Sequence, residues 1–253
     1  MKKFNGEVAF VAGGSGGMGT EIVKKFLIEG AKVVSADIND PSKKINDDNV
    51  TYCKLDATDP ISWDKAIKHS LKKFKKISIL VNCFGSNYRK DFKDQTIKDW
   101  NKIININLTA VFIGINSVIP IIEKENGGSV INFGSIVTMR PGSTGPAYQA
   151  SKTGLIGLTK SAALSFANKN IRFNLVCPGH VDTDFIRANN SYSPNDWSTS
   201  INNLENYNSR KKQIPLKNFQ NPEDIANLVL FLASSESKMI TGAVIPVDGG
   251  SSL

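Results

Sequence analysis

The sequence predicts an α/β fold in which one doubly wound parallel sheet of about seven strands is flanked by helices on both faces. Three observations carry this prediction. Short apolar runs alternate with longer helical patterns, and the connections between them are short. A glycine-rich loop separates the first run from the first helix. The 253 residues are 40% hydrophobic and 21% charged, a globular composition. We therefore expect one domain over residues 1–253.

The expected strands are apolar runs of the kind that a sheet covered on both faces contains. We place them at residues 8–12, 32–38, 50–56, 77–81, 129–133, 171–177 and 243–247. The expected helices repeat apolar residues every three to four positions. We place them at 18–29, 60–74, 96–122, 148–167 and 222–232, with Pro120 marking or kinking the end of the third.

The glycine-rich loop follows the first expected strand directly and reads Gly13-Gly-Ser-Gly-Gly-Met-Gly19. Glycines let the backbone turn tightly and approach a pyrophosphate, to which the next helix offers free N–H groups. Two glycine spacings fit such a site: Gly14, Gly16 and Gly19, or Gly13, Gly17 and Gly19. Because a strand precedes the loop and a helix follows it, the unit predicts a Rossmann-type dinucleotide site.

An acidic residue, Asp37, ends the second expected strand about 20 residues beyond the glycines. A carboxylate at this position accepts hydrogen bonds from the adenosine ribose hydroxyls and repels the 2′-phosphate of NADP. The next residue is Ile38, and no arginine is near, although Lys43 and Lys44 follow in the loop. The sequence therefore predicts NAD over NADP, and the two lysines are the argument for the other cofactor.

A tyrosine and a lysine lie one turn apart in the fourth expected helix. Tyr148 and Lys152 are spaced i and i+4, so they share a helix face, and Ser135 lies thirteen residues before the tyrosine. A free tyrosine has a pKa of about 10. A lysine cation about 5 Å away, at an effective dielectric constant of about 20, favours the phenolate by roughly 3 kcal/mol. Such a tyrosine is a usable general acid or base, and the serine hydroxyl orients a substrate oxygen.

The candidate polar residues follow the carboxyl ends of expected strands, where parallel sheets bind ligands. They are Asp37, Asp56, Asn82, Ser135 and Gly179. The segment 180–215 begins on the same rim, is rich in Asn and Ser, and is too long for an ordinary connection. We expect it to be a substrate-binding lid, and a disordered insertion is the alternative.

The formal net charge of +8 raises the question of a nucleic-acid partner. The lysines are dispersed, however, and the two small basic clusters at residues 72–76 and 210–212 are typical of solvated surfaces. We predict a small-molecule substrate and no nucleic-acid partner. A basic surface also attracts anionic cofactors and substrates.

Cysteine and histidine content argues against a disulfide framework and against a metal site. The three cysteines are far apart and form no C-x-x-C pair, and there are only two histidines. No apolar run approaches the roughly 18 residues of a membrane span. The N-terminal apolar run is short, contains Glu7 and breaks at the glycine loop. We expect a cytoplasmic protein without a membrane partner.

The order and spacing of these motifs resemble the short-chain dehydrogenases/reductases over essentially the whole chain. The resemblance rests on the glycine loop 13–19, Asp37, Leu55-Asp56, Asn82 to Gly85, Asn107, Ser135, Tyr148-x-x-x-Lys152, Pro178-Gly179 with Thr183, and Val247-Asp-Gly-Gly250. In this family the glycine register is Gly13, Gly17 and Gly19. The chain departs from the family pattern at Ala12, where a Thr is usual, and at Cys83-Phe84, where Asn-Ala is usual.

The resemblance implies a role for each matching residue. Tyr148 is the general acid/base, Lys152 lowers its pKa and holds the nicotinamide ribose, and Ser135 orients the substrate oxygen. Asn107 supports a proton-relay water near the lysine. The implied cofactor contacts are Gly13, Ser15, Gly17, Met18, Gly19, Asp37, Asp56, Ala57, Asn82, Gly85, Tyr148, Lys152, Pro178, Gly179, Val181 and Thr183. The family also implies a homotetramer or a homodimer.

Together these inferences predict an NAD-dependent oxidoreductase that interconverts a secondary alcohol and a ketone. Two alternatives remain open. One is a 3-oxoacyl-thioester (acyl-carrier-protein) reductase, whose relatives usually prefer the phosphorylated cofactor. The other is a non-catalytic protein that binds NAD(H) as a sensor, against which the intact set of four candidate catalytic residues argues.

Overall fold

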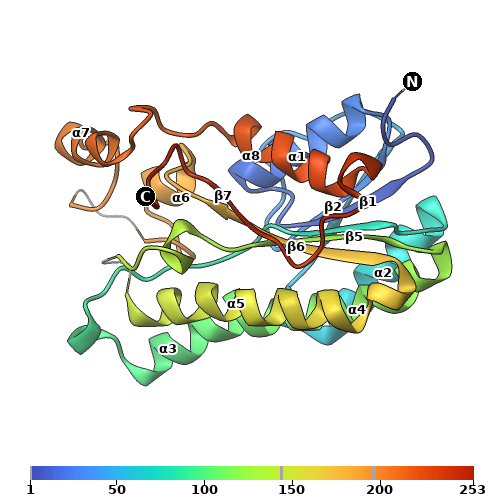
Figure 1. Ribbon diagram of the computed structural model, residues 1–253, viewed down its shortest axis with the longest axis horizontal. Helices are drawn as coiled ribbons and strands as arrows, with labels where there is room; N and C mark the ends of the chain where they lie inside the picture. The colour runs from blue at the N-terminus through green and yellow to red at the C-terminus, as the bar shows by residue number, and fades with distance from the viewer. Residues whose placement is uncertain (1, 143–144, 195–197) are drawn as a thin grey trace.

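The computed structural model describes residues 2–142, 145–194 and 198–253. Its seven strands form one parallel sheet in the order β3-β2-β1-β4-β5-β6-β7 (Figure 1). The strands are β1 Val8–Ala12, β2 Lys32–Asp37, β3 Val50–Lys54, β4 Ile79–Asn82, β5 Gly128–Phe133, β6 Ile171–Pro178 and β7 Val244–Val247. After β3 the chain crosses back to place β4 beside β1, and the carboxyl edge at this reversal is where such sheets bind ligands. The predicted fold is confirmed.

Helices cover both faces of the sheet (Figure 1). They are α1 Gly17–Ile28, α2 Pro60–Phe74, α3 Ile97–Ile104, α4 Ala110–Ile122, α5 Pro146–Ser165, α6 Asp184–Arg187, α7 Leu204–Gln213 and α8 Pro222–Ala233. Short 3₁₀ turns lie at Phe92–Asp94, Glu123–Glu125, Ile136–Thr138, Ala167–Lys169 and Ser235–Ser237. Helices α1 and α8 pack on one face, and α2, α4 and α5 pack on the other.

The two faces bury separate apolar clusters because successive side chains of a strand point to opposite sides. In β1, Phe10 contributes to the cluster under α2, α4 and α5, whereas Val11 contributes to the cluster under α1 and α8. Trp63 of α2 is fully buried and stacks on Phe10 with ring centroids 5.6 Å apart. Each such large side chain stabilises the fold by about 1.5–3 kcal/mol. This frame holds the strand ends in fixed positions.

The predicted helix 96–122 is divided in the structure. A π-helical turn, Asn105–Thr109, separates α3 from α4, and Pro120 lies inside α4 near its end at Ile122. By length and composition alone, residues 97–125 are apolar enough to cross a membrane. In the described chain, however, α4 buries residues such as Val118 against the sheet, which is the position of a core helix.

The segment 180–215 contains two helices where the sequence indicated only a long connection. Its described residues include α6 and α7, which lie together at one end of the molecule in Figure 1. Within the segment, Asn203 caps α7 by accepting a hydrogen bond from the N–H of Glu205. Outside it, Thr96 and Asp99 form a capping box at the start of α3.

Candidate active site

A single large cavity runs along the carboxyl ends of the strands and contains nearly all the predicted site residues. Its volume is about 1620 Å³. That exceeds the roughly 300–1,000 Å³ of a site for one small ligand, so it has room for a dinucleotide and a substrate. The predicted residues on its wall are Gly13, Ser15, Gly17, Met18, Gly19, Asp37, Asp56, Ala57, Gly85, Ser135, Tyr148, Lys152, Pro178, Gly179, Val181 and Thr183.

The glycine loop has the geometry that a pyrophosphate site needs. Gly13 has φ +87°, and a Cβ there would lie 2.7 Å from the backbone of Cys83. A Cβ on Gly19 would lie 2.0 Å from the carbonyl oxygen of Gly13. Helix α1 starts after Gly16 without a side-chain cap, so its first N–H groups are free to bind an anion. The loop therefore packs too tightly on the protein's own backbone for a side chain at Gly13 or Gly19, and both glycines line the cavity.

The carboxylate of Asp37 stands at the end of β2 and holds the glycine loop. It accepts hydrogen bonds from the backbone N–H groups of Ser15, at 3.0 Å, and Asn39, at 2.9 Å. The charge therefore has a fixed position on the cavity wall. A ribose hydroxyl can donate a hydrogen bond to this carboxylate. Among the described residues no cation forms an ion pair with Asp37, so its negative charge would repel a phosphate.

The lysines near this end of the cavity do not line its wall. Lys44 lies over the ring of Tyr52, 5.7 Å from its centroid, and Lys43 is exposed. Lys54 pairs with Asp40 at 3.2 Å. None of these three lysines lines the cavity. The argument for NADP that Lys43 and Lys44 supplied is therefore weaker in the structure than in the sequence.

Asp56 and Ala57 lie just beyond β3, on the adjacent part of the wall. One carboxylate oxygen of Asp56 accepts from the N–H and hydroxyl of Thr58, at 2.9 and 2.7 Å. The carbonyl oxygen of Ala57 accepts from the indole N–H of Trp63 at 2.9 Å. The tryptophan anchored in the core thereby fixes this turn.

Tyr148, Ser135 and Lys152 meet in the middle of the cavity wall. The Ser135 hydroxyl lies close enough to the Tyr148 phenol to lower its pKa. Lys152 Nζ lies 5.9 Å from the centroid of the tyrosine ring and donates to the carbonyl oxygen of Phe133 at 2.8 Å. Both Tyr148 and Lys152 are buried, with 8% and 4% of their surfaces exposed. The arrangement places one proton donor and acceptor, one orienting hydroxyl and one cation at a single position.

The pKa values differ from the sequence prediction. Burial raises the pKa of Tyr148, and the Ser135 hydrogen bond and the charge of Arg89 oppose that rise. Burial lowers the pKa of Lys152 from 10.5 to about 8. Desolvation is the largest cause of the shift at Tyr148, so the net direction of its pKa is upward.

Asn107 lies behind the catalytic wall, inside the π-helical turn. Its Oδ1 accepts from Ser86 N–H at 2.7 Å, and its Nδ2 donates to Ser86 O at 2.8 Å and to Ser151 Oγ at 3.1 Å. The side chain is fully buried. A Cβ on Gly85 would lie 3.3 Å from both Asn107 Oδ1 and Lys152 Nζ, so these groups converge on one point. π-helical turns occur often at functional sites.

Asn82 is the second predicted residue that does not line the cavity. It is 1% exposed, and its Nδ2 donates to Asn132 Oδ1 at 2.9 Å. Asn132 in turn donates to Thr159 Oγ1 at 3.0 Å. Asn82 is the last residue of β4, and its side chain packs between the sheet and a neighbouring helix. The cavity wall after β4 is formed instead by Cys83, Phe84 and Gly85.

The residues after β6 close the cavity against the glycine loop. A Cβ on Gly17 would lie 2.7 Å from Thr183 Cγ2, so the two loops touch. Val181 is 5% exposed and forms a bridge with Gln220. Pro178 and Gly179 connect β6 to this wall.

The residues that line the cavity without having been singled out as site residues include Asn87, Arg89 and Arg210. Asn87 is 2% exposed, and its Oδ1 has no hydrogen-bond partner in the described chain. Arg210 was predicted to lie on a solvated face within cluster 210–212. It is instead partly buried, whereas Lys212 of the same helix is exposed. The signal available for Arg210 was its place in a segment that begins on the ligand rim.

The loop after β4 is joined to the segment 180–215. The carbonyl oxygen of Tyr192 accepts from Asn87 N–H at 2.9 Å and from Ser86 Oγ at 2.6 Å. Arg89 donates to Ser193 Oγ at 2.9 Å and to Phe185 O at 3.1 Å. These contacts hold the described part of the segment over the cavity.

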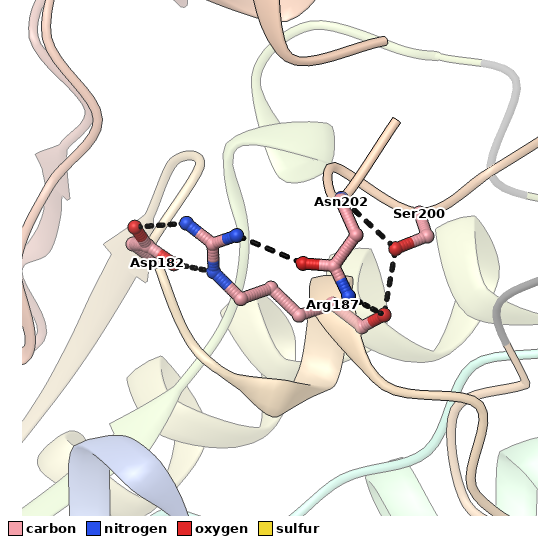
Figure 2. A network of polar contacts seen from close by, with 4 residues as sticks. All are labelled: Asp182, Arg187, Ser200 and Asn202. Atoms are coloured by element: carbon pink, nitrogen blue, oxygen red, sulfur yellow. Dashed lines mark hydrogen bonds and ion pairs between the residues drawn. The ribbon is translucent and has the colours of Figure 1, made fainter. Parts of the chain in front are cut away.

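A second polar network ties the segment to itself (Figure 2). Arg187 donates through two nitrogens to the carboxylate of Asp182, and it donates to Asn202 Oδ1 at 2.9 Å. The carbonyl oxygen of Arg187 accepts from Ser200 Oγ at 2.6 Å. Arg187 therefore connects Asp182, near the start of the segment, to Ser200 and Asn202 beyond α6.

Comparison with known proteins gives consistent matches over nearly the full chain. A family model described as enoyl-(acyl carrier protein) reductase matches residues 12–252. The 2,5-dichloro-2,5-cyclohexadiene-1,4-diol dehydrogenase LinX of Sphingobium indicum is 36% identical over 252 residues, covering 97% of this chain and 96% of that protein. The ligand-free aldohexose dehydrogenase of Thermoplasma acidophilum has a TM-score of 0.89 at 30% identity, covering 99% of this chain and 96% of its own.

Similar proteins differ in the nicotinamide cofactor that their names state. The NADP-dependent (R)-specific alcohol dehydrogenase of Lentilactobacillus kefiri is 34% identical and covers 98% of this chain and 97% of its own. A 3-ketoacyl-(acyl-carrier-protein) reductase from Brucella melitensis, complexed with NADH, shares the fold with a TM-score of 0.84 at 24% identity, covering 98% of this chain and 99% of its own. Similarity alone therefore leaves the choice between NAD and NADP to the residues of the site.

Proposed function

Because the chain belongs to the short-chain dehydrogenase/reductase family of oxidoreductases, we propose that it transfers hydride between NAD(H) and a secondary alcohol or its ketone. The observation that carries the proposal is the meeting of Tyr148, Ser135 and Lys152 on the wall of one cavity. The same cavity extends to the glycine loop. A proton-transfer group and a dinucleotide cradle in one space are what this reaction requires.

The cradle fits the cofactor through this chain's own groups. The glycine loop and the N-terminus of α1 would bind the pyrophosphate, and Asp37 would bind the adenosine ribose. Lys152 would hold the nicotinamide ribose, and Val181 and Thr183 would lie beside the carboxamide. When bound, the nicotinamide supplies the hydride chemistry.

In the proposed reaction Tyr148 transfers the proton and Ser135 orients the substrate. In the oxidative direction the phenolate of Tyr148 takes the proton of the substrate hydroxyl, which Ser135 orients. In the reductive direction the phenol returns that proton to the carbonyl oxygen. The raised pKa of the buried tyrosine favours its protonated form, which is the form that acts as the acid. The cationic Lys152 favours the phenolate only if it keeps its own proton, which its lowered pKa restricts to pH below about 8.

A 3-oxoacyl-(acyl-carrier-protein) reductase is the second candidate, and the 34% identity to the reductase FabG of Thermotoga maritima favours it. The same Tyr148 and Ser135 would serve a 3-oxoacyl thioester. The charge at Asp37 argues against it, since relatives with that activity usually prefer NADP. A non-catalytic NAD(H) sensor is the third candidate, and it does not account for the placement of Tyr148, Ser135 and Lys152 on one cavity wall.

The test is cofactor reduction by the purified protein with a panel of secondary alcohols, run with NAD and NADP side by side. The reverse reaction uses ketones and a 3-oxoacyl thioester with NADH and NADPH. Turnover of alcohols with NAD supports the proposal, and preferential turnover of the thioester with NADPH supports the second candidate. NADH binding without turnover on either panel contradicts both enzymatic readings and favours the sensor.

A homotetramer or homodimer is part of the proposal. Helices α4 and α5 each carry a large exposed apolar side chain, Phe112 at 52% and Leu164 at 83%. A second copy of the chain would remove these from water. Sedimentation equilibrium of the purified protein tests this, and a concentration-independent monomer would contradict it. A cytoplasmic location is likewise proposed, and fractionation of the source cells tests it.

A further inference from the structure

The end of the cavity under the segment 180–215 contains two arginines that no ion pair neutralises in the described chain. Arg89 and Arg210 both line the cavity, together with Tyr148. The carboxylates on this part of the wall are those of Asp91 and Asp184, which are exposed at its mouth. Neither forms an ion pair with Arg89 or Arg210. A partly buried cation without a counterion is costly unless something binds it.

The two guanidinium groups retain free donors that could face a ligand. Arg89 uses its terminal nitrogens on uncharged acceptors, namely Ser193 Oγ, Pro194 O and Phe185 O. Arg210 makes one hydrogen bond, from its Nη2 to the carbonyl oxygen of Thr199. Since a guanidinium has five N–H donors, both side chains keep donors that these protein acceptors do not use.

The two arginines repel each other and act on the catalytic tyrosine. Burial and the charge of Arg210 lower the pKa of Arg89 to about 10, and burial lowers the pKa of Arg210. The charge of Arg89 in turn opposes the rise in the pKa of Tyr148. An anion between the arginines would relieve this repulsion and would lie within reach of the reacting group.

A third group at the same end lacks a partner. The side chain of Asn87 is almost fully buried, lines the cavity, and has an unsatisfied Oδ1. His180 also faces this end, and burial together with the charge of Arg210 lowers its pKa to about 4, so it is neutral at pH 7 and does not supply a competing charge. The wall therefore offers two cations and one buried acceptor to a polar ligand.

We propose that the substrate carries an anionic oxygen group, a carboxylate or a phosphate ester, that binds between Arg89 and Arg210. The inference rests on the proposed function, because it assigns one end of the same substrate. Arginine is suited to this task, since its planar fork donates to two oxygens of a carboxylate or phosphate at once. Neutral sugars, steroids and cyclic diols would leave both cations without a counterion.

The test measures binding by calorimetry, with benzoate, phenyl phosphate and the neutral benzamide as probes. Each is titrated into the full-length protein with and without saturating NADH. We expect one of the two anions to bind at least about tenfold more tightly than benzamide. The anion that does so distinguishes the carboxylate from the phosphate. Cofactor oxidation on the alcohol panel is a separate readout, so failure of the proposed function would be recognised independently of these titrations.

Variants assign the effect to the arginines. Arg210→Gln should abolish the preference for the anion, Arg210→Lys should retain part of it, and Lys212→Gln removes a charge from the exposed side of the same helix as a matched control. Arg89→Gln should act like Arg210→Gln, with thermal unfolding checking that the fold persists. Equal binding of charged and neutral probes overturns the proposal, as does an anion preference that survives both Gln variants, or no anion binding at about 50 mM.

Discussion

The two ends of the cavity differ in the charged groups that line them. The end beside the glycine loop is lined by the carboxylates of Asp37, Asp40 and Asp56, whereas the other end is lined by Arg89 and Arg210, with Asp91 and Asp184 exposed at its mouth. The acidic end suits neutral ribose hydroxyls, and the basic end suits an anion. In the proposed function, this difference in charge would direct the cofactor and the anionic substrate to different ends of the cavity.

The two ends also differ in how they are built. The acidic end belongs to loops that follow adjacent strands, and its groups are fixed by backbone hydrogen bonds within about 20 residues of one another. The basic end depends on contacts between the loop after β4 and a segment about 100 residues later, such as Arg89 to Ser193. We therefore expect changes at the centre to abolish the reaction, changes at the acidic end to alter cofactor choice, and changes in the lid to alter substrate binding.

The largest expected effect lies between the two ends, at Tyr148. Tyr148→Phe removes the only hydroxyl that exchanges a proton with the substrate in the proposed reaction. We expect kcat to fall by about 10³-fold, within the usual range for general acid–base catalysis, while the dissociation constant of NADH stays within about twofold. Stopped-flow turnover and NADH fluorescence titration measure the two quantities. Near-normal turnover in the variant would contradict the mechanism.

Lys152 should make the free energy of unfolding rise with pH, whereas the buried thiols should make it fall. Its pKa falls from 10.5 to about 8 on folding. The unfolded chain therefore binds more protons between these values, and the free energy of unfolding should rise with pH through that window, by about 3 kcal/mol in all. Burial raises the pKa of Cys83 to about 12 and that of Cys53 to about 11, so those thiols lower stability above pH 9.

Comparison with Lys152→Met isolates the contribution of the lysine, since the cysteines are common to both proteins. Urea unfolding at pH 8, 9 and 10 should show the difference in unfolding free energy between wild type and variant growing in favour of the wild type as the pH rises. Parallel pH profiles would mean that the lysine is not desolvated as the structure indicates.

The acidic end should decide cofactor choice. Asp37→Asn removes the charge but keeps an oxygen that can accept from a backbone N–H. We expect the ratio of kcat/KM for NAD over NADP to fall by about tenfold, equivalent to 1.4 kcal/mol. Asp64→Asn, on the exposed side of α2, is the matched control. An unchanged ratio in Asp37→Asn would remove the basis for preferring NAD.

The glycine loop, the Tyr148–Lys152 pair and the strand ends could be predicted from the sequence, because each depends on residues that are close together in the chain. The positive φ and close contacts of Gly13 follow from a loop that must turn between a strand and a helix. The spacing of Tyr148 and Lys152 reports their shared helix face directly. The strand ends that line up these groups follow from the alternation of apolar runs, which the sheet order confirms.

The remainder of the site could not be predicted, because it depends on long-range packing. Asn82 matched a motif, yet its side chain is drawn to Asn132 of the neighbouring strand rather than to the cavity. The π-helical turn around Asn107 leaves no periodic signal in an otherwise continuous helical pattern. Arg210 reads as part of a charged run, and only the course of the segment 180–215 turns it toward the cavity while Lys212 faces water.

The smallest expected effect tests whether the segment 180–215 acts as a lid, independently of the glycine-loop end of the cavity. Asp182→Asn weakens the fork with Arg187 drawn in Figure 2. Because the two side chains are 34% and 31% exposed, solvent screens the pair, and its loss should cost less than about 1 kcal/mol. We expect KM for the substrate to rise about threefold with kcat nearly unchanged. Glu205→Gln, an exposed change on α7, is the control.

NADH affinity separates the two interpretations of that result. Thr183, which touches Gly17 of the cofactor loop, follows Asp182 directly, so a disturbance that spread through the backbone would weaken NADH binding as well. If the lid moves on its own, fluorescence titration should give the same NADH dissociation constant for Asp182→Asn and wild type. Equal losses of NADH and substrate affinity would show that the two ends of the cavity are mechanically one unit, and that the difference between them is one of charge alone.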